Sequence, residues 1–500
     1  MGESVKYLSL IVYFFILFLI GWWASKKIKN ASDFFAGGKS LGYWVVAFSA
    51  RASGESAWLL LGLTGMGAIY GMQAMWVVLG EVLGVGIAWF FMAKKFKRLT
   101  DEYRSITIPD FLSSHFKTNS KLIRIVSSFT LSIFVIIFVS AQIDATGKAF
   151  EAFLGWQYYL GIFIGFLIVV VYITSGGFIA VAWSDLFQGL VMMIGLVALP
   201  IVAYFAWSQE TGIGETLSQM DPAMLHVRGD GNISKNIWTY IGFGMIGLGF
   251  LGSPQIFVRF ISIKDNKEIK KGKYVAVVYT ILTDAAAVFI GMAGRAYFTD
   301  AGIDPEEVLG VKAENVLPML VENIMPMLVI GFYIAAVLSA IMSTIDSLLV
   351  VASSAVARDF YQKILNPSLP DDKMTKISRM ATIIMAAIAL GLALLVSVIS
   401  PTRNIFWFSI FGWSGIAATF CPMIILILSW KRYTSYGAIA SMITGFASVG
   451  LCKFYFAGLD SIGYYFNEMG ELFPSFVISI FFGVIVSFVH KSSIQKVETS

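Results

Sequence analysis

The sequence predicts an all-α polytopic membrane protein, and three observations lead to that prediction. Of the 500 residues, 57% are hydrophobic and only 13% are charged, which is about half the charged share of an ordinary soluble protein. The chain holds 42 Phe and 13 Trp but only 12 Pro. A soluble core could not bury so many apolar side chains, whereas a bilayer accepts them. This composition also excludes a disordered chain, a coiled coil, collagen and a disulfide-stapled secreted fold.

About thirteen apolar stretches are long enough to cross roughly 30 Å of hydrocarbon as helices. In chain order they cover residues 6–24, 41–71, 72–92, 121–147, 157–175, 180–207, 236–258, 274–298, 327–355, 379–399, 404–429, 434–457 and 472–489. The first stretch does not resemble a cleaved signal peptide, because its basic cluster at 26–29 follows the apolar run instead of preceding it.

The distribution of positive charge predicts the orientation of these spans. Six segments fall on one side of the membrane under this count and hold 27 of the 36 Lys and Arg residues: 25–40, 93–124, 259–273, 356–379, 430–433 and 490–500. Basic loops face the cytoplasm. On the opposite side, the loop 297–326 is acidic. We therefore expect an integral protein of the plasma (inner) membrane, with the N-terminus outside and the C-terminus in the cytoplasm.

Polar residues interrupt the second span at 49–58. Arg51 and Glu55 are four residues apart there and would pair if the stretch were helical. Gly54 and the neighbouring serines favour local unwinding, which frees backbone carbonyls to face a cavity. The alternative is a buried Arg–Glu pair in a helix that is only kinked.

Glycine interrupts the seventh span, where five glycines and a proline lie within 242–254. Such a helix is expected to break, although glycine also permits tight helix packing. The two interrupted spans lie five spans apart, which is the spacing of a 5+5 inverted repeat with its site at the midplane. The expected division of the chain is 1–40 (first peripheral helix and cytoplasmic loop), 41–207 (first five-helix repeat), 208–430 (second repeat with long external loops) and 431–500 (two peripheral helices and a short tail).

Hydroxyl groups and carboxylates also occur at membrane depth. Ser343, Thr344, Asp346 and Ser347 lie close together in the ninth span, and hard oxygen ligands of this kind suit a small hard cation. Back-bonding of the hydroxyls to helix carbonyls is the alternative, and it does not explain Asp346. Asp185 lies near the predicted start of the sixth span, where it would either join a site or stabilise the helix dipole.

Several classes of function are disfavoured. The chain has no phosphate-binding Gly-rich loop with Lys and Ser or Thr, which argues against ATP-driven transport. Its three His and two Cys are scattered and form no metal motif. We find no nucleophile beside a base within the spans, so we expect no enzyme activity. A proton-coupled transporter remains an alternative, because Glu55, Glu81, Asp185 and Asp346 could carry protons.

Five motifs resemble a known family. They are Phe34–Gly42, the run Ser-Ala-x-Ala-Ser-x-x-Ser-x-Trp-Leu-Leu-x-Gly-Leu at 49–63, Gly176-Gly-Phe-x-Ala-Val-x-Trp-x-Asp185, Gly249-x-x-Gly-x-Pro254 followed by Arg259-Phe260, and Ala340-x-Met-Ser-Thr344. In this order they are similar to the sodium:solute symporter family, and within it to the sodium/proline symporters. The similarity extends to about residue 460 and together the motifs are specific.

The resemblance implies a thirteen-helix leucine-transporter-like fold and sodium as the coupling ion. Carried over by position, the implied sodium ligands are Ala52, Glu55 (main chain only), Ala340, Ser343 and Thr344. Some relatives hold a further sodium, and the matching positions here are Asp185, Ser343, Asp346 and Ser347.

The resemblance also implies uptake of a small organic solute, proline or a related amino acid, driven by sodium. The expected substrate residues are Ser53, Ser56, Ala57, Glu81, Ile246, Phe250 and Pro254. The pocket departs from the proline symporters, which carry Asp where Gly54 stands, Trp at position 246 and Tyr at position 250. A cationic or carboxylate solute, and a non-transporting sensor or channel, therefore remain alternatives. The expected partners are the solute, sodium and the lipid bilayer, with no nucleic acid and no required oligomer.

Overall fold

The computed structural model describes residues 2–28, 31–117, 121–370 and 373–490 of the chain. These residues form helices joined by turns and short loops, with one isolated parallel bridge between Leu41 and Ile263. The predicted all-α class is confirmed.

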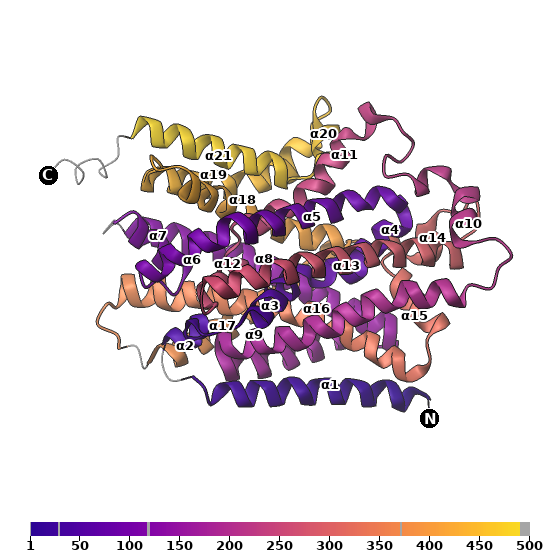
Figure 1. Ribbon diagram of the computed structural model, residues 1–500, viewed down its shortest axis with the longest axis horizontal. Coiled ribbons are helices and arrows are strands. Elements are labelled where there is room, and N and C mark those ends of the chain that lie inside the picture. Colours follow the sequence, from indigo (N-terminus) through magenta and orange to yellow (C-terminus); the bar gives the residue numbers. More distant parts are fainter. Residues whose placement is uncertain (1, 29–30, 118–120, 371–372, 491–500) are drawn as a thin grey trace.

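The helices of the apolar regions form the body of the molecule (Figure 1). They are α1 (Gly2–Ser25), α3 (Tyr43–Ala57), α4 (Thr64–Tyr70), α5 (Met75–Ile87), α8 (Lys121–Leu154), α9 (Tyr158–Ala206), α11 (Ile233–Met245), α12 (Pro254–Ser262), α13 (Asn266–Phe298), α16 (Met327–Ser354), α17 (Met374–Ile399), α18 (Ile405–Ser429), α19 (Ser435–Gly450) and α21 (Leu472–Val489).

Shorter helices lie at the two ends of this body. They are α2 (Ala31–Ala36), α6 (Ala93–Glu102), α7 (Ile108–His115), α10 (Ile213–Met220), α14 (Pro305–Leu309), α15 (Val316–Ile324) and α20 (Gly463–Met469). Single 3₁₀ or π turns extend or join helices at η1 (Gly37–Lys39), η2 (Trp58–Leu63), η3 (Gly71–Ala74), η4 (Ala88–Met92), η5 (Pro222–Leu225), η6 (Ile246–Leu251), η7 (Val311–Ala313), η8 (Ala355–Leu365), η10 (Leu451–Tyr455) and η11 (Phe456–Gly458).

The described residues contain 11 helical segments long and apolar enough to cross a membrane. One of them, Tyr43–Glu102, covers two predicted spans, and the chain turns within it at Gly71, whose φ of 55° lies in the left-handed region. The predicted spans 157–175 and 180–207 both lie in α9, which is kinked at Gly177 with φ 52°. The predicted count of thirteen stays a prediction.

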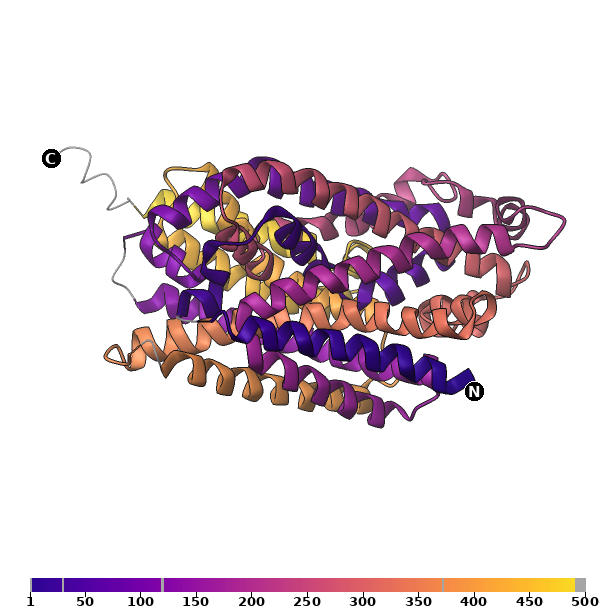
Figure 2. The same cartoon turned by 60° about the horizontal axis from the view of Figure 1, so that its bottom comes forward.

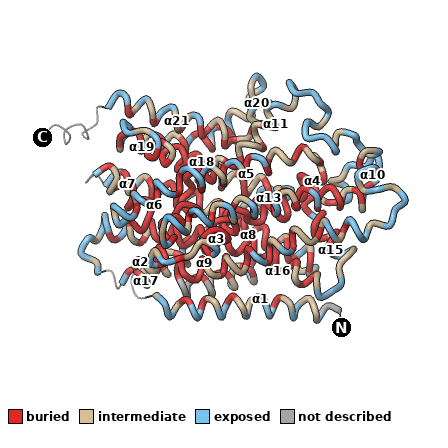
Figure 3. Tube along the Cα trace, viewed as in Figure 1, coloured by how far each residue is buried: buried red, intermediate tan, exposed pale blue. Residues whose placement is uncertain are grey.

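Helices α3, α16 and α18 lie in the buried interior of the molecule. In the most apolar part of the segment that includes α16, 83% of the residues are buried, against 28% in α1. Figure 3 shows the same contrast between the interior and the outer helices. Figure 2 brings α1 forward, and there it lies along the outside of the bundle, where it packs on α9 and α16. Polar groups on α3 and α16 are therefore shielded from lipid.

Both interrupted spans break. Helix α3 loses helical geometry at Ser56, where φ is 39° and ψ is −170°. In the other span, α11 ends at Met245, η6 follows, and α12 begins at Pro254. The two breaks face each other, since a Cβ added at Gly54 would lie 2.7 Å from the ring of Phe250. The predicted meeting of the two broken helices is therefore present in the fold.

The two ends of the chain lie at opposite ends of the bundle. Helix α1 begins on the side of α10, α14 and α15, whereas α21 ends on the side of α6 and α7 (Figure 1). An odd number of membrane crossings produces this arrangement.

Candidate functional site

Hydroxyl groups of α16 meet backbone carbonyls of α3. Ser343 Oγ donates to the Ala52 carbonyl at 2.9 Å, and Thr344 Oγ1 donates to the Ser53 carbonyl at 3.3 Å. Both hydroxyls also bond back to the Ala340 carbonyl, at 3.2 and 3.1 Å. The predicted back-bonding within α16 is present, and each hydroxyl also bonds across to α3, while their role as cation ligands stays a prediction. Five oxygen atoms thus lie on one buried seam between two helices.

The break in α3 occurs one residue after Glu55. At Ser56 the backbone takes a left-handed φ that non-glycine residues seldom adopt, so the helical ladder is interrupted there. The Ala57 N–H is not bonded within the helix but donates to Gln142 Oε1 of α8 at 3.0 Å. The Glu55 carbonyl accepts the Trp58 N–H. A side chain from a third helix therefore stabilises the interruption.

The residues predicted for a second sodium surround a guanidinium group. Arg259 Nη2 lies 2.9 Å from Asp185 Oδ2 and 2.5 Å from Ser53 Oγ, and it also donates to Ser347 Oγ. Arg259 Nε donates to Ser49 Oγ at 3.0 Å. We counted Arg259 among the basic residues of the cytoplasmic segment 259–273. In the structure Arg259 lies in α12, within the candidate membrane segment Asn236–Ser262, and it is fully buried there instead of exposed in a loop.

Asp346 lies at the edge of this network. Ser347 Oγ donates to Asp346 Oδ1 at 3.3 Å. Ser343, which was also predicted for the second sodium, bonds to the carbonyls of Ala52 and Ala340. Arg259 pairs with Asp185, and Asp346 is joined to the same network through Ser347.

Arg51 forms the centre of a second charged group in α3. Its Nη2 lies 2.7 Å from Glu55 Oε1, which confirms the i, i+4 pair expected from the sequence. Its Nη1 lies 3.4 Å from Glu81 Oε2 of α5, and Nη2 lies 3.7 Å from Asp284 Oδ1 of α13. Glu81 was predicted as a substrate residue, and here its side chain contacts Arg51.

The remaining predicted substrate residues lie near the two breaks. The Phe250 ring lies 4.6 Å from the Arg51 guanidinium carbon and packs against Trp413 with centroids 5.1 Å apart. Trp413 Nε1 also donates to the Ile246 carbonyl at 3.0 Å. Phe250 fills the space beside Gly54, so the aspartate of the proline symporters would not fit there in this arrangement. Pro254 begins α12, and Ser53 belongs to the Arg259 network.

The sequence analysis overlooked several residues of the site. Asp284 lies in the predicted span 274–298, and the rule that singled out Asp346 would have found it. Gln142 could have been found in the same way in the span 121–147. Trp413 could not have been predicted as a site residue, because tryptophan is common in apolar membrane helices. The contact of Arg259 with Asp185 joins α12 to α9 across 74 residues, which no local pattern shows.

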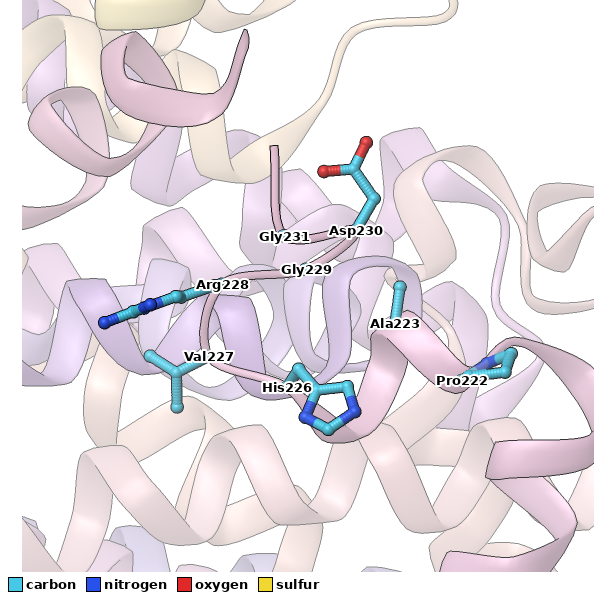
Figure 4. A pocket seen from close by; sticks show the side chains of 8 residues that line it. All are labelled: Pro222, Ala223, His226, Val227, Arg228, Gly229, Asp230 and Gly231. Carbon is cyan, nitrogen blue, oxygen red and sulfur yellow. The ribbon is translucent and has the colours of Figure 1, made fainter. Parts of the chain in front are cut away.

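A surface pocket of about 430 Å³ lies far from these helices in sequence, in the loop that follows α10. Its lining residues are Pro222, Ala223, His226, Val227, Arg228, Gly229, Asp230 and Gly231. Figure 4 shows the side chains of His226, Arg228 and Asp230 pointing in different directions. They do not converge on a point where a ligand would be held.

These features together define a class of protein. A broken membrane helix with freed backbone groups, facing hydroxyls on a buried neighbouring helix, is typical of secondary transporters that couple an ion to a solute. The comparisons with known proteins name the family within that class.

The sequence profile of the sodium:solute symporter family matches residues 34–445. The osmoregulated proline transporter OpuE of Bacillus subtilis (strain 168) is 34% identical over 97% of this chain and 94% of its own length. The high-affinity proline transporter PutP of the same organism is 35% identical over 94% of this chain and 96% of its own length. The chain belongs to the sodium:solute symporter family. It is an integral membrane transporter, and sodium is its coupling ion.

Solved structures agree on the fold. A Na⁺-coupled sialic acid symporter in a substrate-bound outward-open state superposes with a TM-score of 0.78 at 20% identity, covering 98% of each chain. MhsT in complex with L-phenylalanine gives a TM-score of 0.55 at 15% identity, covering 89% of this chain and 98% of that one. The predicted leucine-transporter-like fold is confirmed.

Proposed function

We propose that the protein couples the inward flow of sodium to the uptake of proline or a related amino acid. The curated relatives that share about a third of its sequence are proline transporters. The observation that carries the proposal is the seam between α3 and α16, where Ser343 and Thr344 hydroxyls lie 2.9 and 3.3 Å from carbonyl oxygens beside a helix break. These are hard, neutral oxygen atoms at membrane depth, which suit an alkali ion.

The proposed sodium ligands are the carbonyls of Ala52, Glu55 and Ala340 and the hydroxyls of Ser343 and Thr344. Sodium would draw these groups together and so join α3 to α16. A second sodium beside Asp346 and Ser347 is supported by the carboxylate that Asp346 adds next to the pair of Arg259 and Asp185. We place the solute at the two breaks, next to Ser56, Ala57, Phe250 and Pro254.

Closure of the bundle over both ligands, followed by opening to the other side, would complete the cycle. The proposed moving units are the repeats 41–207 and 208–430, flanked by 1–40 and 431–500. One charge crossing 100 mV releases about 2.3 kcal/mol, and a tenfold sodium gradient adds about 1.4 kcal/mol. One sodium per neutral solute would therefore support roughly several-hundredfold accumulation. The proposed orientation has the N-terminus outside and the C-terminus in the cytoplasm of the plasma membrane.

The test is uptake of radiolabelled proline and other amino acids into liposomes that contain the purified protein. We expect uptake to require a sodium gradient at fixed pH and to stop when potassium replaces sodium. The double variant Ser343→Ala, Thr344→Ala should lower uptake by at least tenfold, because it removes both hydroxyl ligands.

Ser353→Ala is the matched control. Ser353 lies fully buried in the same helix and bonds only to the Val350 carbonyl at 3.1 Å, so this variant should transport normally. Sodium-independent uptake that follows a pH gradient would instead support a proton-coupled transporter. Binding without uptake would support a sensor.

A further inference from the structure

All proposed ligands of the first sodium are electrically neutral. They are three backbone carbonyls, from Ala52, Glu55 and Ala340, and two hydroxyls, from Ser343 and Thr344. All five residues are fully buried. A cation that leaves water for such a place needs a nearby negative charge, because its hydration is lost and the surroundings have a low dielectric constant.

A concentration of negative charge lies beside these ligands. The Arg51 cluster consists of Arg51 and Glu55 on α3, Glu81 on α5 and Asp284 on α13, and each side chain is at most 1% exposed. Arg51 contacts all three carboxylates, at 2.7, 3.4 and 3.7 Å. A guanidinium group stays protonated in proteins. Arg51 is the cation that contacts all three carboxylates among the described residues, so the cluster is net negative whenever more than one of them is ionised.

The carboxylates of the cluster also lack hydrogen-bond donors. Glu55 Oε2, Glu81 Oε1 and Asp284 Oδ2 are buried and have no hydrogen-bond partner among the described residues. A buried charged oxygen without a donor is costly, so native structures seldom leave one unpaired. With three such atoms in one cluster, its negative charge is poorly compensated by local donors, so its field favours a cation bound nearby.

The chain connects this cluster directly to the sodium ligands. Ala52 follows Arg51, and Glu55 belongs to both sets, with its carbonyl in the proposed site and its carboxylate in the cluster. Thr283 Oγ1 of α13 donates to Glu55 Oε1 at 3.1 Å and thereby holds that carboxylate in place. The end of α3 that carries the carbonyl ligands is thus fixed by side chains of α5 and α13.

We propose that the Arg51 cluster supplies the negative charge that balances the bound sodium, with Glu81 and Asp284 as positioning residues that set sodium affinity without touching the ion. The inference rests on the proposed sodium site between α3 and α16. It assigns Glu81 to ion binding in place of the substrate contact expected from the sequence.

The group around Arg259 is the other source of negative charge near the seam. Arg259 pairs with Asp185 there, and Asp346 adds one further carboxylate. If this group balanced the ion, Asp346→Asn would weaken sodium binding and changes in the Arg51 cluster would not. The two sources therefore predict opposite outcomes for the same measurement.

The experiment measures the sodium concentration that gives half-maximal uptake in liposomes, for the wild type and for Glu81→Gln and Asp284→Asn. Each variant removes one charge and keeps the shape of the side chain. Because the carboxylate acts on the ion through protein of low dielectric constant, we expect about a tenfold rise in that concentration. The solute concentration for half-maximal uptake at saturating sodium should stay within about twofold, because neither residue contacts the solute.

Two further variants separate charge from packing. Glu81→Asp keeps the charge and should restore most of the sodium affinity. Glu322→Gln removes an exposed carboxylate that pairs with Lys6 at 3.1 Å, and it should leave sodium affinity unchanged. If a variant no longer transports, sodium-induced thermal stabilisation of the purified protein provides the same comparison.

Each outcome decides a different question. If uptake by the wild type does not depend on sodium, the proposed function itself is wrong. In the second case, uptake by the wild type depends on sodium while Glu81→Gln and Asp284→Asn leave the half-saturating sodium concentration unchanged. That result overturns the counter-charge inference, because the charge of these carboxylates then does not affect sodium binding. A loss of affinity in Asp346→Asn alone also overturns it.

Discussion

At the residue scale, Arg259 and Asp185 form an ion pair with no exposure to solvent on either side chain. We predict that Arg259→Gln and Asp185→Asn each lower the stability of the protein by about 3–5 kcal/mol, because each leaves the other charge buried without a partner. The double variant should be more stable than the sum of the two losses implies. Thermal unfolding of purified protein measures the loss of stability in the two single variants and in the double variant. Strictly additive losses would show that the two charges are not coupled.

His115 provides a prediction for pH. It lies in α7, outside the membrane spans, where burial and then the charge of Lys95 lower its pKa from 6.5 to about 4. Between these values the unfolded chain binds more protons than the folded one, so stability falls as the pH drops below 6.5. We expect the thermal unfolding temperature to decrease from about pH 7.5 to about pH 5 for this reason.

His115→Phe is the comparison for that experiment. Phe111 stacks on the His115 ring with centroids 5.8 Å apart, so an aromatic side chain suits the place. Because phenylalanine does not bind a proton, the unfolding temperature of this variant should decrease less between the two pH values. An identical decrease in both proteins would mean that other groups cause it.

At the element scale, α5 and η6 approach so closely that backbone contacts backbone. A Cβ added at Gly247 would lie 1.9 Å from the Gly80 carbonyl oxygen, and one added at Gly80 would lie 2.0 Å from the Gly244 carbonyl oxygen. Glycine is required at this crossing because any side chain would separate the two segments. The segment that carries Ile246 and Phe250 is therefore held against the helix that carries Glu81.

We predict that Gly247→Ala pushes η6 away from α5 and lowers uptake by tenfold or more, since even an ångström of displacement at a binding site has effects of about a hundredfold in other systems. Gly86→Ala is the matched control, because no atom lies within 4 Å of a Cβ at that position in α5. Equal uptake by Gly247→Ala and the wild type would show that this crossing tolerates separation.

At the scale of the whole molecule, the orientation in the membrane can be tested through cysteine labelling. The two native cysteines, Cys421 and Cys452, are both buried, so they provide a low background. Gln209 is exposed in the loop that follows α9, and Lys267 is exposed in the first turn of α13, at the opposite end of the bundle. We predict that a membrane-impermeant maleimide labels Gln209→Cys in intact cells and labels Lys267→Cys only after permeabilisation. The reverse pattern would invert the proposed topology.

Local sequence was enough to predict the class of fold and the places where helices break. Long apolar runs must be helical in a bilayer, since only that structure satisfies every backbone group within one segment. The glycines of 242–254 predicted an interruption, and η6 lies there. In the second span the break falls at Ser56, one of the serines beside Gly54 that predicted unwinding, and Gln142 bonds to the Ala57 N–H there.

The sequence by itself determined which residues had to be sheltered from lipid. Arg51, Glu55, Asp185 and Asp346 are too costly to expose there, and each is buried in the interior of the bundle. Only the tertiary structure decided their partners. Arg259 reaches Asp185, and Asp284 reaches Arg51, because helices distant in the chain pack side by side. Such pairings depend on helix rotation and depth, which the order of residues along one helix does not specify.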